Sequence, residues 1–176
     1  SPKGDLMAVG TSIPIHIFPI VWQVRKTLER FGDDIKPGDM FIGNDPYDGG
    51  THLNDVLIFT PIYFQDELVG YAANRAHWYD IGGMVPGSIS GSARELYQEG
   101  LRIPPIKLVE EGKLNQAVWR ILNKNVRVPE MVQGDVMAQM SALRQGERDV
   151  LRIIEEYGIE DIKSYMTDII DYTERI

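Results

Sequence analysis

The chain has 176 residues, 43% of them hydrophobic and 25% charged, which predicts a folded protein with one sizeable core and excludes a disordered one. Its formal net charge of −8 argues against nucleic acid or an anionic membrane as a partner, because both attract basic surfaces. The absence of cysteine excludes disulfides and thiolate metal ligands, and it leads us to expect a cytoplasmic protein.

The first part of the chain predicts a strand followed by a helix. Residues 5–10 are mostly apolar and predict a short strand, and residues 18–31 repeat apolar side chains at helical spacing. Pro19 suits the first turn of this helix, and Gly32 suits its C-terminal cap. We expect His16 to be a loop or capping residue at the head of the helix, although it could also face a site. The apolar residues here are interrupted by polar ones, so we expect no membrane span.

Three apolar runs in the middle of the chain predict strands. Residues 40–42 form a short buried run, and residues 56–63 and 68–73 predict an antiparallel hairpin that turns at Gln65-Asp66. Counting outward from this turn places Asp55 opposite Ala76, and a shift of one residue places it opposite His77. Pro61 predicts an edge strand or a bulge, and a bulge would produce such a shift.

Two of the three histidines lie at the two ends of this hairpin, and each precedes an aspartate by three residues. Directly paired residues have Cβ atoms about 4.5–5.5 Å apart, so His52, Asp55 and His77 could converge. Imidazole and carboxylate ligands suit zinc, manganese or iron(II), and an open coordination position would activate water or polarise a carbonyl. The same residue types also occur in ordinary turns, where a histidine hydrogen-bonds to the backbone. Spacing alone leaves both interpretations open.

The remaining chain predicts a loop, a strand and helices. Residues 82–92 are rich in glycine and serine but match neither a phosphate-binding loop nor a nucleophile elbow, and we expect a mobile loop that shields the site. Residues 106–109 predict a strand. A long helix is expected from Pro129 to Gly158, with a last amphipathic helix after it. We therefore expect an α+β fold, with a small, mainly antiparallel or mixed sheet carrying the site hairpin in residues 1–110 and a helical region in residues 111–176.

Ordered motifs occur along nearly the whole chain. They are Pro37-Gly38-Asp39, Asn44-Asp45-Pro46-Tyr47, Gly49-Gly50-Thr51-His52-Leu53 with Asp55, Asn74-Arg75-Ala76-His77, Asp80-Ile81-Gly82-Gly83, Pro86-Gly87-Ser88, Glu99 to Pro105, Pro129-Glu130 and Gly134-Asp135. With these motifs the chain resembles the B-type subunit of the ATP-dependent hydantoinase and oxoprolinase family. Relatives of that family include the metal-bearing large subunits of acetone and acetophenone carboxylases. The family commonly has proline at the position of Asn54.

The resemblance implies a divided enzyme. A partner A-type subunit would bind ATP and phosphorylate the substrate or bicarbonate, and the B-type subunit would hold a divalent metal such as zinc, manganese or iron. The metal ligands that the motifs carry over are His52, Asp55 and His77. Asp80 and Asp45 are expected as catalytic residues, each either as a fourth ligand or as a partner that orients a histidine.

The implied activity is ATP-dependent hydrolysis of a small cyclic amide, of the hydantoinase or oxoprolinase type, with no nucleic acid or membrane involved. Two alternatives remain, a subunit of an ATP-dependent ketone carboxylase and a non-catalytic assembly module with a structural metal. Members of the family are longer, and this chain begins at Ser1 without methionine. We therefore expect it to be one part of a larger B-type subunit whose remaining segments are partners as well.

Overall fold

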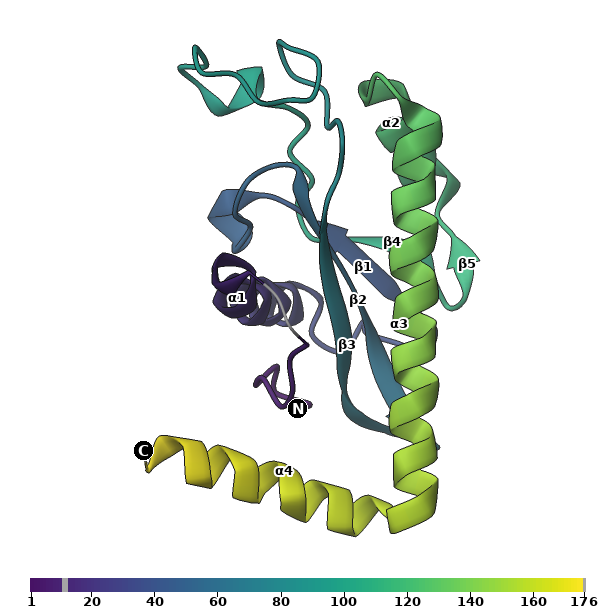
Figure 1. Cartoon of the computed structure of the whole chain (residues 1–176). Coiled ribbons are helices and arrows are strands. Elements are labelled where there is room, and N and C mark those ends of the chain that lie inside the picture. Colours follow the sequence, from purple (N-terminus) through teal and green to yellow (C-terminus); the bar gives the residue numbers. More distant parts are fainter. Residues whose placement is uncertain (11–12, 176) are drawn as a thin grey trace.

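The computed structural model describes residues 1–10 and 13–175, and in this part of the chain one five-stranded sheet packs with four α-helices (Figure 1). The sheet order is β3-β2-β1-β4-β5, and all four recorded pairings are antiparallel. The strands are β1 (Met40–Gly43), β2 (Asp55–Phe64), β3 (Glu67–His77), β4 (Ile106–Glu110) and β5 (Lys113–Leu114). The expected α+β class with a mainly antiparallel sheet is confirmed.

Helices cover both faces of the sheet, which explains the continuous apolar run of β2. Side chains alternate between faces along a strand, so Val56 and Ile58 join one core cluster while Leu57 and Phe59 join another. The first cluster includes residues of α3 (Pro129–Tyr157), and the second includes residues of α1 (Pro14–Phe31). A strand buried on both faces is apolar without interruption.

Helix α1 begins earlier than the sequence predicts. It starts at Pro14, and a helix tolerates proline at its first position because the N–H of that position has no partner within the helix. Pro19 therefore lies inside the helix and not in its first turn. Pro19 has no N–H and so removes one backbone hydrogen bond from the helix. Gln23, Val24 and Thr27 of the same helix are buried. His16 therefore belongs to the first turn of α1, and the helix sets the position of its side chain.

The strand predicted for residues 5–10 is wrong. Residues 1–10 form turns and irregular backbone, without a strand. The Oγ of Ser1 donates a hydrogen bond to Oδ2 of Asp5 (2.7 Å), and Asp5 pairs with Arg25 of α1. These polar contacts tie the segment to α1, so its backbone does not join a sheet edge.

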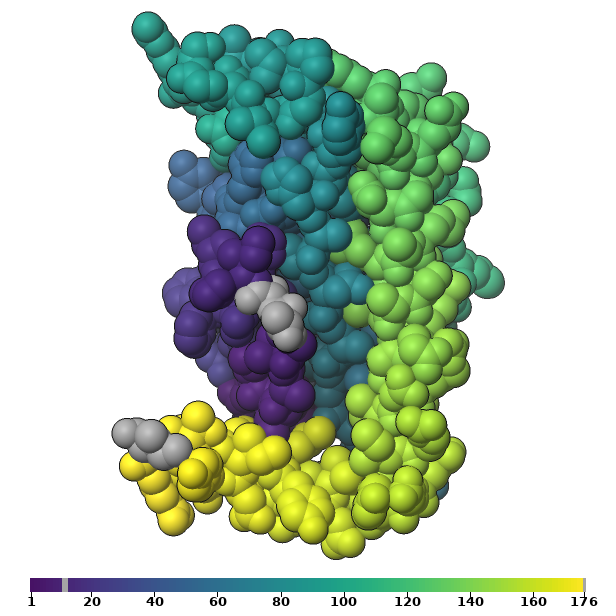
Figure 2. All heavy atoms as spheres, viewed as in Figure 1, coloured from purple at the N-terminus to yellow at the C-terminus, as the bar shows by residue number. Residues whose placement is uncertain are grey.

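The C-terminal part is helical, as expected. It contains α2 (Gln116–Asn125), α3 along the sheet, and α4 (Ile159–Glu174), which turns away from α3 and runs across the foot of the molecule (Figures 1 and 2). The first core cluster joins residues on both sides of residue 110, and the predicted division at that residue stays a prediction. Within the described residues, no helix has both the length and the apolar character for a membrane crossing.

Candidate metal centre

The strand register of the hairpin places Asp55 directly opposite His77. Phe64 pairs with Glu67 beside the turn, but Ile62 pairs with Gly70 and Tyr63 with Leu68, which leaves Val69 as an extra residue in β3. This bulge adjoins Pro61 and shifts every pair beyond it by one residue. Of the two registers considered from the sequence, the one that depends on a bulge is confirmed.

The loop between β1 and β2 folds back so that His52 lies beside Asp55. It contains the short 3-10 helix η1 (Pro46–Asp48), and the backbone N–H of Asp55 donates to the carbonyl of His52 at 2.9 Å. Asn44 is fully buried; its Nδ2 donates to the carbonyl of Leu53 (2.6 Å), and its Oδ1 accepts from the N–H of Ile103 (2.7 Å). The buried amide therefore holds the loop against the segment before β4.

His52, Asp55 and His77 form one convergent group. Each offers a ligand atom, and these atoms lie within 4.8 Å of one another. The rings of His52 and His77 have centroids 5.5 Å apart, and Nδ1 of His77 lies 2.8 Å from Oδ1 of Asp55. Asp55 is buried, His52 is half-buried, and the His77 side chain is 48% exposed. Two imidazoles and one carboxylate at this spacing fit the donor set of zinc, manganese or iron.

Hydrogen bonds keep Asp55 ionised. Its Oδ2 accepts from the Oγ of Thr51 (3.0 Å) and lies 3.1 Å from Nε2 of His16. Burial alone would raise the pKa of Asp55, but the hydrogen bonds with His77, Thr51 and His16 outweigh it and lower that pKa below its ordinary value. The group is therefore a carboxylate at neutral pH, the form that binds metal ions.

Arg75 is connected to this carboxylate through the hydroxyl of Thr51. Its Nη2 donates to Oε1 of Gln23 in α1 (2.6 Å), and its Nη1 donates to the Oγ of Thr51 (3.4 Å). Burial lowers the pKa of Arg75 to about 10, and the negative charge of Asp55 opposes that change, so the guanidinium stays charged at neutral pH. Arg75 thus connects α1, the loop and the metal-ligand candidates.

Asp45 lies in the same loop but is bound to other groups. Its Oδ1 accepts from the N–H of Tyr47 (3.0 Å) and caps η1. Its Oδ2 accepts two hydrogen bonds from Arg102, from Nε at 3.1 Å and from Nη2 at 2.8 Å. Within the described residues, Asp45 is outside the convergent group of possible metal ligands.

Asp80 is buried and binds the loop that follows the hairpin. It accepts hydrogen bonds from the backbone N–H groups of Gly82 (2.9 Å), Gly87 (3.1 Å) and Arg127 (2.9 Å), and from Nη1 of Arg127 (3.1 Å). Burial alone would raise the pKa of Asp80, but these hydrogen bonds outweigh it and lower that pKa. Asp80 too is outside the convergent group in the part of the chain that the structure describes. Catalytic roles for Asp45 and Asp80 stay predictions.

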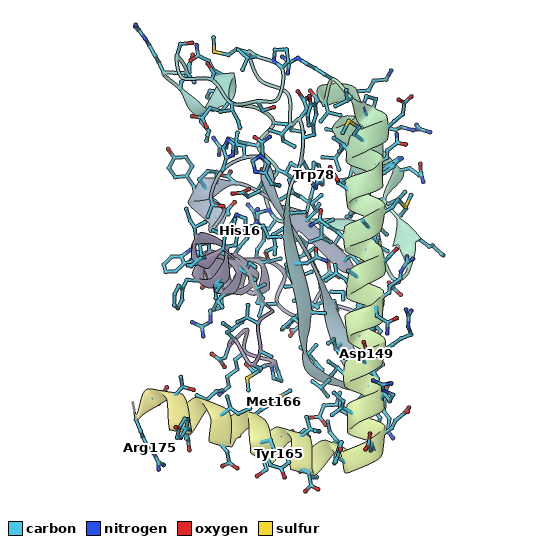
Figure 3. The ribbon with its side chains drawn as sticks, in the orientation of Figure 1. His16, Trp78, Asp149, Tyr165, Met166 and Arg175 are labelled. Atoms are coloured by element: carbon cyan, nitrogen blue, oxygen red, sulfur yellow. The ribbon has the colours of Figure 1, made fainter. Side chains whose placement is uncertain are left out.

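A buried amide of α3 supports the end of the hairpin from the other side of the sheet. Oε1 of Gln139 accepts from the indole Nε1 of Trp78 (2.8 Å), and its Nε2 donates to the carbonyl of Val56 (3.0 Å) and to Oδ1 of Asn74 (3.0 Å). Trp78 follows the last residue of β3 and lies at the end of the hairpin near α3 (Figure 3). Val56 and Trp78 adjoin Asp55 and His77, so α3 holds the backbone that carries two candidate ligands.

The convergent group lies at the surface of the chain. It is separate from the cavity of about 430 Å³ that the structure contains. That cavity lies between residues 1–10, α1, β3 and α3, and its lining is mostly apolar. None of His52, Asp55 and His77 lines it. The exposed ring of His77 therefore leaves the group accessible from outside the chain.

Sequence reasoning named His52, Asp55 and His77 as candidates, and the structure brings all three together. It did not assign Thr51, Arg75 or Gln139 to the site, and for His16 it favoured a loop or capping role over a role that faces the site. The usable signal for His16 was its rarity, as one of three histidines. Arg75 belongs to the motif that contains His77, but nothing in the local pattern indicates its contact with α1.

The whole chain, residues 1–176, matches the family described as hydantoinase B/oxoprolinase. An uncharacterized protein of Methanocaldococcus jannaschii is 43% identical over 99% of this chain and 31% of its own length. The caprolactamase subunit beta of Pseudomonas jessenii is 34% identical over 97% of this chain and 29% of its own length. The chain thus spans less than a third of these relatives.

Solved structures show the same fold. A chain of the crystal structure of ATP-dependent caprolactamase from Pseudomonas jessenii is 35% identical and superimposes with a TM-score of 0.90, over 94% of this chain and 29% of that one. A chain of nucleotide-free acetone carboxylase superimposes with a TM-score of 0.88 at 22% identity, over 94% of this chain and 22% of that one. The second likeness shows the fold alone.

Proposed function

This chain belongs to the hydantoinase B/oxoprolinase family, and we propose that it provides the divalent-metal centre of an ATP-dependent enzyme that hydrolyses a cyclic amide. The observation that carries the proposal is the convergence of His52, Asp55 and His77, whose ligand atoms lie within 4.8 Å of one another. The reaction class is supported by the relative that is named for the hydrolysis of a cyclic amide, caprolactamase.

His52, Asp55 and His77 would hold the metal. When bound, a divalent metal supplies Lewis acidity, which polarises a carbonyl group or lowers the pKa of water. The buried Asp55 enters as a carboxylate, since its pKa is lowered by its hydrogen bonds. The exposed ring of His77 leaves one side of the group open, where a small substrate carbonyl could approach.

Asp45 and Asp80 would contribute from the two loops that adjoin the hairpin, before β2 and after β3. Asp45 binds Arg102 and Asp80 binds Arg127, and each carboxylate also accepts backbone N–H groups of its own loop. These contacts favour roles in shaping the walls of the substrate site. A catalytic role for either residue predicts a variant that keeps its fold and its metal affinity but loses turnover.

We propose that ATP is bound by a partner A-type subunit and that the remaining segments of the B-type subunit complete the substrate site. The chain contains no phosphate-binding lysine motif. The Pseudomonas jessenii relative is named as one subunit of its enzyme, and this chain corresponds to 29% of that relative. The surface position of the convergent group agrees with a site completed by other chain segments. The lack of cysteine supports a location in the reducing cytoplasm.

A ketone carboxylase subunit is the second candidate, because the fold also superimposes on acetone carboxylase. The lower identity of that likeness, 22% against 35% for caprolactamase, favours the hydrolase. A substrate panel separates the two. The purified complex is supplied with ATP and with hydantoins, 5-oxoproline or lactams, and then with ketones in the presence of bicarbonate. Consumption of ATP with cyclic amides alone supports the hydrolase, whereas consumption only with ketones and bicarbonate supports the carboxylase.

The metal centre is tested by His52→Ala, His77→Ala and Asp55→Asn in the subunit purified with its partner. Each should lower the metal affinity by at least about 100-fold while the complex stays assembled. Asp66→Asn is the matched control, because Asp66 is an exposed aspartate at the opposite end of the same hairpin. Loss of assembly together with the metal would instead indicate a structural metal, and unchanged metal content in all three variants would contradict the site.

A further inference from the structure

Helix α1 contacts the candidate metal centre through two residues on one side of the helix. His16 and Gln23 are seven residues apart, which is close to two helical turns and places both on the same face. Nε2 of His16 lies 3.1 Å from Oδ2 of Asp55, and both side chains are largely buried, at 14% and 9% exposed. Oε1 of Gln23 accepts the 2.6 Å hydrogen bond from Arg75.

Both contacts lead to the same oxygen of Asp55. His16 reaches Oδ2 directly. Gln23 reaches it indirectly, since Arg75 binds the Oγ of Thr51 (3.4 Å), and that hydroxyl donates to Oδ2 (3.0 Å). Among the described residues, Oδ1 has a hydrogen-bond contact with His77, whose Nδ1 lies 2.8 Å away. The two oxygens of one carboxylate therefore face different partners, with α1 and the loop on Oδ2 and a candidate ligand on Oδ1.

His16 is separate from the convergent group, although it contacts a member of that group. Among the described residues the group with mutually close ligand atoms contains His52, Asp55 and His77, and not His16. To donate a hydrogen bond to Oδ2, the His16 ring must carry its proton on Nε2, and a protonated ring nitrogen has no lone pair for a metal. The contact therefore suits a residue that orients the ligand and not a residue that binds the metal.

We propose that His16 is a positioning residue, which donates a hydrogen bond from Nε2 to Oδ2 of Asp55 and so directs Oδ1 of that carboxylate to the metal. The inference rests on the proposed metal centre. Removal of a partner that orients a ligand in this way commonly weakens metal affinity by about 10- to 100-fold. The first turn of α1, which begins at Pro14, carries this contact.

The test measures Zn²⁺ and Mn²⁺ affinity of the purified chain by competition with a chromophoric chelator. His16→Ala should weaken binding by about 10- to 100-fold. His16→Gln should recover most of the affinity, because its amide N–H lies near the position of the imidazole Nε2. Phe18→Ala is the control on the same helix; Phe18 is 78% exposed and should leave affinity unchanged. Urea unfolding of each variant separates metal affinity from stability.

The ring nitrogens of the three histidines give a second readout in the wild-type chain, by ¹⁵N NMR with labelled histidine. On adding Zn²⁺, the rings of His52 and His77 should acquire metal-bound nitrogen shifts, while Nε2 of His16 should stay protonated. A metal-bound shift for His16, or His16→Ala with wild-type affinity, would overturn this inference and leave the metal centre in place. No metal binding by the wild type would overturn both. If His16→Ala does not fold, His16→Gln and the wild-type spectrum decide.

Discussion

Gln139 offers the sharpest test of how the helical part supports the site, through the substitution Gln139→Met. Its side chain is 5% exposed and makes three hydrogen bonds, with Trp78, with the carbonyl of Val56 and with Asn74. Methionine fills a similar volume but leaves these polar groups buried without their partner. Each such group costs about 1–3 kcal/mol, and partial relaxation leads us to expect a loss of about 3–5 kcal/mol in the free energy of unfolding.

The assay is urea unfolding followed by tryptophan fluorescence, where the midpoint should fall without a change in slope. For a chain of this size the expected loss corresponds to a decrease in melting temperature of roughly 10 °C. Gln145→Met is the matched control, because Gln145 is an exposed glutamine of the same helix, and its effect should stay within about 0.5 kcal/mol. Metal affinity should also fall for Gln139→Met, since Val56 and Trp78 adjoin Asp55 and His77. Equal stabilities of the two variants would refute the reasoning.

Two further predictions concern the loops around the site. The pKa of Asp80 is lowered in the folded chain, so the unfolded chain binds more protons at acidic pH. The stability that this carboxylate contributes is therefore complete above its ordinary pKa of 3.8. It is lost as the pH falls below that value. Asp80→Asn should be less stable at pH 7 and should lose less stability between pH 7 and about 3 than the wild type, measured by urea unfolding across that range; a parallel decline in both would contradict this. Gly50→Ala should weaken metal binding and lower stability by about 2 kcal/mol or more, because its Cβ would lie 2.2 Å from the carbonyl oxygen of Asn44. Gly134→Ala is the comparison. Its Cβ meets nothing within 4 Å, so it should raise stability by about 0.5–1 kcal/mol. Chelator competition and melting curves check this pair.

The hairpin shows how far periodicity reaches. Apolar runs predict both strands, because a strand buried on two faces needs apolar side chains at every position. The register was ambiguous by one residue, and the bulge at Val69 resolves it. The sequence could only indicate that Pro61 weakens regular pairing, since the place of a bulge depends on how β3 packs against its neighbours.

The C-terminal helices show the complementary limit. The helical period predicted α3 as an apolar stripe from Pro129 to Gly158, and the structure confirms it. That pattern marks which face is buried but carries no sign that the polar Gln139, lying on that face, binds Trp78. A polar residue in an apolar stripe becomes meaningful only when its partners, 61 and 83 residues away in the sequence, are known.

The sequence by itself determined the α+β class, the family motifs and the three candidate ligands, because residue types, local periods and ordered motifs are properties of neighbouring positions. The tertiary structure decided that His52, Asp55 and His77 meet, and that His16 and Gln139 support them from opposite sides of the sheet. Such contacts depend on bulges, helix starts and packing between distant segments. Those are set by the energy of the whole fold, and no local pattern encodes them.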